Sequence, residues 1–157
     1  MGREEVKDQI IRWLSYEKNW SFQEHPDPIY YFTCKVQMSE SLGCNVCVEN
    51  DIERVDIITN GKFSQSDSIK YKLAPKNKKD DFWLDLKIRL VHVGVNVNPM
   101  PDIENLRSIQ IAKLIYFDRL SQDRLINTML KVAEALELTE LIFRNFSERM
   151  GQQGRRV

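Results

Sequence analysis

The sequence predicts an α+β fold in the order α-β-β-β-α-β-β-α, with helices packed on an antiparallel five-stranded sheet. Three observations support this fold class. The first and last segments of the chain have apolar residues that recur every three or four positions, as on one face of a helix. Between them, three short β-branched and aromatic segments follow one another with turn residues between, which is typical of an antiparallel meander. Strands and helices do not alternate regularly, so we do not expect a Rossmann-like nucleotide site.

The length and the net charge of the chain indicate how many domains to expect and which class of partner is unexpected. The 157 residues suit a single core, and we expect one α+β domain over residues 1–150 followed by a flexible tail over residues 151–157. The 23 basic and 23 acidic side chains give a formal net charge of zero. Since affinity for nucleic acids comes mainly from neutralising phosphates, this balance makes a nucleic acid an unexpected partner.

The first part of the chain divides into a helix and three strands. Val6, Ile10 and Leu14 share one face of the helix that we expect over residues 3–18. The three strands are placed at residues 29–38, 45–49 and 54–59, and the turn dipeptide Asn60–Gly61 follows the third strand.

The polar segment that follows contains a short helix and a loop. Ser66 or Asp67 fits the N-cap of the helix, which ends before Pro75. The basic run from Lys76 to Lys79 fits a solvated loop.

Residues 80–93 satisfy two patterns. Apolar and charged residues alternate through the middle of this segment, as in a strand, yet Phe82, Leu86 and Leu90 recur at helical spacing. Two aspartates at the start and Gly94 after the end are helix boundary signals. The composition is rich in leucine rather than in β-branched residues, so we favour a helix.

Two strands and a long helix complete the predicted order. The strands are expected at residues 95–97 and 109–117. Ser121 fits the N-cap of the last helix, whose apolar stripe continues to about Met150.

The sequence also indicates a compartment. No apolar run approaches the roughly 18–20 residues that a membrane-spanning helix needs, and the N-terminal residues lack the apolar core of a signal peptide. Cys34, Cys44 and Cys47 are few and odd in number for a disulfide-stapled secreted domain. We therefore expect a soluble protein of the reducing cytoplasm.

The element order and three local patterns resemble a fold family. The patterns are the opening helix around Ile10 to Leu14, the strand Ile109-Gln110-Ile111, and the segment from Tyr116 to Ser121 before the last helix. The chain resembles the type III secretion chaperone-like fold, the YbjN-type proteins, and an uncharacterised, largely archaeal family sharing that fold. The resemblance implies a homodimer, since members of this fold are typically dimeric and the best-known ones hold partially unfolded protein segments. It implies no catalytic residue.

A CxxC pair is the most suggestive chemical motif. Zinc needs about four ligands, and beside Cys44 and Cys47 only Cys34, His25 and His92 remain as candidates. On a strand, an offset of three residues places the two thiols on opposite faces. We therefore interpret the cysteines as small buried apolar residues, with a metal-binding or redox protein using Cys44 and Cys47 as the alternative.

The leading hypothesis is a non-enzymatic protein-binding module, a chaperone-like or adaptor homodimer that buries an apolar segment of a protein or peptide partner. No nucleophile elbow or phosphate-binding loop is present, so we assign no catalytic, cofactor-binding or metal-ligating residue and expect no cofactor. The aromatic residues are divided between the core and an interface. The expected partner or dimer surface consists of Met100, Ile109, Ile111, Tyr116 and Phe117.

Overall fold

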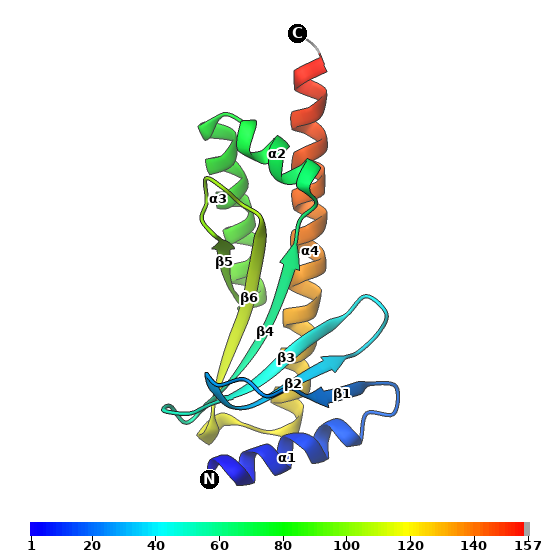
Figure 1. Ribbon diagram of the computed structural model, residues 1–157, viewed down its shortest axis with the longest axis vertical. Helices are drawn as coiled ribbons and strands as arrows, with labels where there is room; N and C mark the ends of the chain where they lie inside the picture. The colour runs from blue at the N-terminus through cyan, green and yellow to red at the C-terminus, as the bar shows by residue number, and fades with distance from the viewer. Residues whose placement is uncertain (156–157) are drawn as a thin grey trace. The chain divides into compact units, whose positions relative to one another are not determined.

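The computed structural model contains four α-helices and six β-strands within the described part of the chain (Figure 1). It describes the backbone of residues 1–155 and the side chains of residues 1–152. In chain order the elements are α1 (Arg3–Ser15), β1 (Ser21–Glu24), β2 (Tyr30–Gln37), β3 (Gly43–Glu49), β4 (Arg54–Lys62), α2 (Gln65–Leu73), α3 (Lys76–Val93), β5 (Asn96–Met100), β6 (Ser108–Tyr116), the short 3₁₀ helix η1 (Phe117–Arg119) and α4 (Gln122–Arg155). Among these helices, none has the length and apolar character needed to span a membrane.

The strands form one antiparallel sheet in the order β1-β2-β3-β4-β6-β5. This confirms the predicted α+β class, but the sheet has six strands where five were expected. The additional strand is β1, which lies at one edge and pairs with β2 so that Phe22 is opposite Val36. A four-residue strand has too short a pattern to be recognised from its own sequence, because its neighbour supplies most of its stabilisation.

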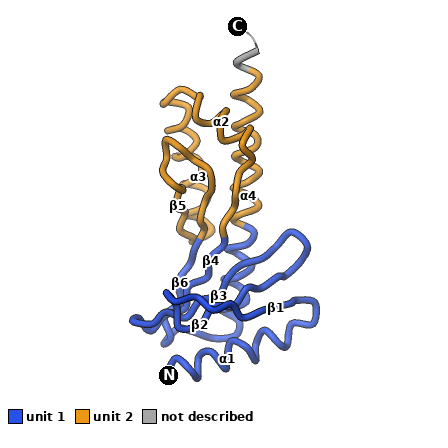
Figure 2. The backbone as a smooth tube through the Cα atoms, in the orientation of Figure 1, with its two compact units in different colours: residues 1–59, 112–134 blue, residues 60–111, 135–157 orange. Residues whose placement is uncertain are grey.

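The chain divides into two compact units, shown in Figure 2. Unit 1 comprises residues 1–59 and 112–134, and unit 2 comprises residues 60–111 together with the chain from residue 135 onward. The divisions fall within β4, β6 and α4, so each of these elements contributes residues to both units. The expected single domain over residues 1–150 therefore has an internal division that composition did not indicate.

The core of unit 1 lies between helices and one face of β2, β3 and β4. The register places Cys34 opposite Val46, and Val46 opposite Ile57, so these three side chains share that face. Helix α1 contacts β3. The helices bury the expected apolar residues, each at most 1% exposed: Val6, Ile10, Leu14, Leu125, Met129 and Val132.

The core of unit 2 is an aromatic cluster. The ring centroid of Tyr71 lies within 6.0 Å of those of Phe82, Phe143 and Phe146. Phe63 stacks on Phe143 with a centroid separation of 3.8 Å and an interplanar angle of 18°. Such ring pairs contribute about 0.5–1.5 kcal/mol beyond the area they bury. Part of the aromatic content therefore forms a core, as expected.

The helix predicted over residues 80–93 is confirmed, but it begins at Lys76. The expected loop over the basic run is therefore wrong. Lys79 is only 6% exposed; its Nζ donates a hydrogen bond to the carbonyl of Lys72 at 3.0 Å and pairs with the carboxylate of Glu104 at 3.5 Å. These partners allow a lysine to be buried inside the first turns of a helix.

The turn predicted at Asn60–Gly61 is also wrong, because β4 continues to Lys62. A Cβ atom built on Gly61 would lie 2.5 Å from Cδ1 of Leu136. Because Gly61 has no side chain, α4 can approach the strand closely at this position. Close approach of a neighbouring segment is, besides a turn or a bulge, a common reason for glycine within a strand.

The last helix extends beyond its predicted end. Within the segment 151–157, where a flexible tail was expected, residues 151–155 are helical and belong to α4. Gly151 lies against the side chain of Lys70, since a Cβ atom built there would be 3.6 Å from Cε of that lysine. Residues 156 and 157 lie outside the described part of the chain.

Candidate functional site

Helix α3 of unit 2 has two apolar faces. One face packs into the aromatic core through Phe82, Trp83, Leu86 and Leu90, which are at most 5% exposed. The other carries Leu84, Ile88 and Val91, whose exposed fractions are 61%, 53% and 73%. These three residues, here called the outer stripe, are spaced by four and then three positions, so they line one side of the helix. A surface helix normally presents polar residues there, and a row of exposed aliphatic side chains indicates an interaction surface.

The charges along α3 are distributed unevenly. Residues 80–85 carry three exposed carboxylates, at Asp80, Asp81 and Asp85. Residues 87–92 carry the exposed cations Lys87 and Arg89. Lys76, Lys78 and Lys79 precede these aspartates in the same helix, and Arg89 Nε pairs with Asp85 Oδ1 at 3.2 Å. Opposite charges therefore lie close together along α3 itself.

A charged cluster in unit 1 is organised around Arg54. Arg54 donates hydrogen bonds to Glu49 through Nη2 at 2.9 Å and to Asp56 through Nε at 3.1 Å. Asp56 is only 4% exposed. Burial raises the pKa of Asp56 to about 7, with the neighbouring Glu49 carboxylate adding to the effect and Arg54 opposing it. The hydrogen-bonding partner Asp56, together with Arg54, lowers the pKa of Glu49. Each charge in this cluster has a partner within the chain.

The three cysteines do not form a common site. Cys44 and Cys47 project from opposite faces of β3, while Cys44 shares a face with Cys34. All three are free and buried, and burial raises the pKa of Cys34 to about 11 and those of Cys44 and Cys47 to about 12. Thiols with such pKa values are weak nucleophiles near neutral pH. Across the described residues, no three His, Cys, Asp or Glu side chains are grouped to hold a metal ion. Cys44 and Cys47 therefore do not face each other on β3, as the metal-binding or redox alternative would require.

A family comparison matches most of the chain. The family described as "Uncharacterized conserved protein (DUF2299)" matches residues 6–143. The chain belongs to the DUF2299 family. A search of curated proteins gave no match.

One solved structure is similar to this DUF2299 protein in fold. It is the crystal structure of an uncharacterized protein from Methanothermobacter thermautotrophicus, with a TM-score of 0.76 and 22% sequence identity. The similarity covers 88% of this chain and 96% of that chain. At this identity the comparison establishes a common fold and carries no information about activity.

The structure separates the five residues that were expected at the partner or dimer surface of the DUF2299 protein. Ile109, Ile111 and Phe117 are 0%, 0% and 4% exposed, so they lie in the core and we remove them from that surface. The two isoleucines alternate along β6 and therefore share its covered face. Tyr116 in unit 1 and Met100 in unit 2 are exposed, at 52% and 43%.

Sequence reasoning missed the outer stripe, although a signal was present. The segment over residues 80–93 contains more apolar residues than one face of a helix can hold. Once Phe82, Leu86 and Leu90 are assigned to the inner face, the remaining aliphatic residues form a second row. The same excess produced the alternating pattern that made the segment resemble a strand.

Proposed function

We propose that this DUF2299 protein is a non-enzymatic protein-binding module of the chaperone-like or adaptor kind, acting in the cytoplasm as a homodimer. The two copies meet through the outer stripe of α3. One observation carries the proposal: three aliphatic side chains, each more than half exposed, line the solvent side of a helix whose other side is already packed in the core.

The physical chemistry of the stripe favours a second copy as its occupant. Fully burying one valine, leucine or isoleucine side chain contributes about 1.5–3 kcal/mol, and a two-fold contact buries each stripe residue twice.

The element order supports the chaperone-like part of the proposal. Without β1 and α2, the observed order is the α-β-β-β-α-β-β-α order through which the sequence resembles secretion chaperones. A dimer of this kind would bind an apolar segment of a protein partner on its remaining exposed surface.

Sedimentation of the full chain tests the dimer. The wild type is expected to sediment as a dimer at micromolar concentration, and Ile88→Glu as a monomer, because a two-fold contact would bury two carboxylates. Leu141→Glu is the matched control, since Leu141 is exposed to the same extent as Ile88, at 52% against 53%, but lies on α4. It should remain dimeric. A monomeric wild type, or equal masses for the two variants, would overturn the proposal.

Binding to a reduced and alkylated, permanently unfolded protein tests the chaperone-like part. The dimer is expected to bind this probe and to slow its aggregation. A wild type that is dimeric but leaves the aggregation rate unchanged would refute the chaperone-like role and retain the homodimer.

A further inference from the structure

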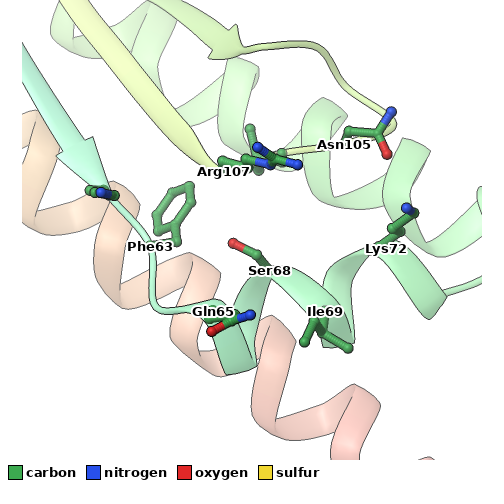
Figure 3. Close-up of a pocket in the computed structure, with 9 residues that line it drawn as sticks. Phe63, Gln65, Ser68, Ile69, Lys72, Asn105 and Arg107 are labelled. Atoms are coloured by element: carbon green, nitrogen blue, oxygen red, sulfur yellow. The ribbon is translucent and has the colours of Figure 1, made fainter.

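Unit 2 contains a pocket away from the outer stripe. Its volume is about 480 Å³, within the range of small-molecule sites. The end of β4, one side of α2 and residues 105–107 line it, as Figure 3 shows, with Phe63, Ser68 and Arg107 around the open space.

The charged residues of the pocket are all basic. Lys62, Lys72 and Arg107 line it, and no aspartate or glutamate does. In the part of the chain whose side chains are described, none of these three cations forms an ion pair. The pocket is therefore electropositive and lacks an internal counter-ion.

The carboxylates on the adjoining segments are engaged elsewhere. Asp67 accepts a hydrogen bond from Ser147 at 2.6 Å, and Glu104 pairs with Lys79. Asp102 accepts a hydrogen bond from the backbone N–H of Asn105 at 2.8 Å. These contacts orient the acidic groups toward other partners, and none of the three carboxylates forms an ion pair with Lys62, Lys72 or Arg107.

Apolar side chains supply a second kind of contact. Leu106 is 1% exposed, and Phe63 is held against Phe143 by ring stacking. Ile69, which is 51% exposed, continues the apolar lining along α2. A ligand that fills this pocket would therefore contact both cations and hydrocarbon.

Hydrogen bonds hold the backbone segments that line the pocket. The indole Nε1 of Trp83 donates to Oη of Tyr71 at 2.7 Å, and this hydroxyl donates to the carbonyl of Ile103 at 2.5 Å, which ties α3, α2 and the 101–107 segment together. The backbone of Arg107 is held on both sides, since its carbonyl accepts from the N–H of Phe63 at 3.0 Å and its N–H donates to the carbonyl of Met100 at 2.9 Å. Preorganised walls lower the ordering cost of binding.

We infer that this pocket binds a small organic anion, a carboxylate or a phosphate monoester that carries an apolar group. Arg107, which can form a bidentate contact, holds the anionic group, and Lys62 and Lys72 add positive charge to the same pocket. The apolar group packs against Phe63, Leu106 and Ile69. This binding activity is separate from the proposed dimer, because none of these residues belongs to the outer stripe.

Fluorescence titration with 1-naphthyl phosphate tests the inference. The wild type is expected to bind it at least about tenfold more tightly than either 1-naphthol or inorganic phosphate, since each of these lacks one half of the recognised chemistry. Equal affinity for 1-naphthol would mean that the cations do not contribute, and equal affinity for inorganic phosphate would mean that the apolar lining does not. Either result would overturn the inference.

Paired variants locate the binding site. Arg107→Gln and Lys72→Gln are each expected to weaken binding of 1-naphthyl phosphate about tenfold, and Lys87→Gln, an exposed cation of α3 outside the pocket, to leave it unchanged. Ile88→Glu should retain binding, which separates the pocket from the dimer. An equal loss in Lys87→Gln, or no loss in either pocket variant, would contradict the inference. Urea unfolding of each variant verifies that the fold is retained.

Discussion

Arg54 in unit 1 and Arg107 in unit 2 show two different uses of a basic side chain. Arg54, at the start of β4, bonds to two carboxylates, and only 23% of its side chain is exposed. Arg107, just before β6, lines a pocket with Lys62 and Lys72 and forms no ion pair with the described side chains. A charge that is paired within the chain contributes to the folded state, whereas like charges placed together cost stability until an external anion neutralises them.

Replacing each arginine by alanine should show the largest difference in stability between the two sites. Arg54→Ala leaves Glu49 and Asp56 without their cation and is expected to lower the free energy of unfolding by about 2 kcal/mol, less than for a fully buried pair because Arg54 is partly exposed. Arg107→Ala removes a cation from a basic pocket and should change the free energy by at most about 0.5 kcal/mol. Urea unfolding measures both. Equal losses of unfolding free energy in the two variants would show that Arg54 and Arg107 contribute equally to the folded state.

The pH dependence of stability tests the paired cluster. The pKa of Asp56 is raised from 3.8 to about 7, so the folded protein binds a proton that the unfolded chain releases near pH 4. The free energy of unfolding should therefore fall as pH rises between these values. Glu49, with its lowered pKa, acts in the opposite direction, but only up to its ordinary pKa of 4.5. The change in the free energy of unfolding between about pH 5 and about pH 7 therefore reflects the titration of Asp56.

The variant Asp56→Asn provides the control for this window. The wild type is expected to lose stability relative to the variant between about pH 5 and about pH 7, as measured by urea unfolding at each pH. Parallel stability curves for the two proteins would show that Asp56 has the same pKa in the folded and unfolded states.

A smaller effect is expected when the pocket is given its own counter-ion. Ser68 lines the pocket on α2, and Ser68→Glu places a carboxylate among the three cations. Stability should rise by up to about 0.5 kcal/mol, as for a partly exposed ion pair, and binding of 1-naphthyl phosphate should be lost. Ser68→Gln, which has the same size without the charge, should weaken binding much less. A similar loss in both variants would indicate steric blocking rather than competition between anions.

The parts of the fold that could be predicted are those with a long local pattern. The faces of α1 and α4, the central strands and the helix over residues 80–93 follow from apolar periodicity and boundary residues. The elements that were missed depend on contacts distant in sequence. Lys79 is helical and buried because Lys72 and Glu104 satisfy its amine, and Gly61 is in a strand because α4 approaches it.

The candidate sites were less predictable than the fold. Ile109, Ile111 and Phe117 were predicted at the surface, but the structure buries them. Sequence periodicity shows how apolar residues are spaced, and it does not show which other segment covers them. The pocket combines residues near position 65 with residues near position 106, and neither stretch has a recognisable motif. Only the outer stripe of α3 had a local signal, which was an excess of apolar residues over those that one face needs.

Disulfide cross-linking at the centre of the outer stripe tests the central claim, contact between two copies through α3, most directly. The natural cysteines are at most 4% exposed and have raised pKa values, so mild oxidation at neutral pH acts on an introduced surface thiol. In a two-fold contact centred on the outer stripe, the two copies of Ile88 are adjacent, within the reach of a disulfide. We predict that Ile88→Cys is converted to a covalent dimer while Leu141→Cys remains monomeric under denaturing conditions. An Ile88→Cys protein that fails to cross-link, or does so no faster than Leu141→Cys, would contradict the account.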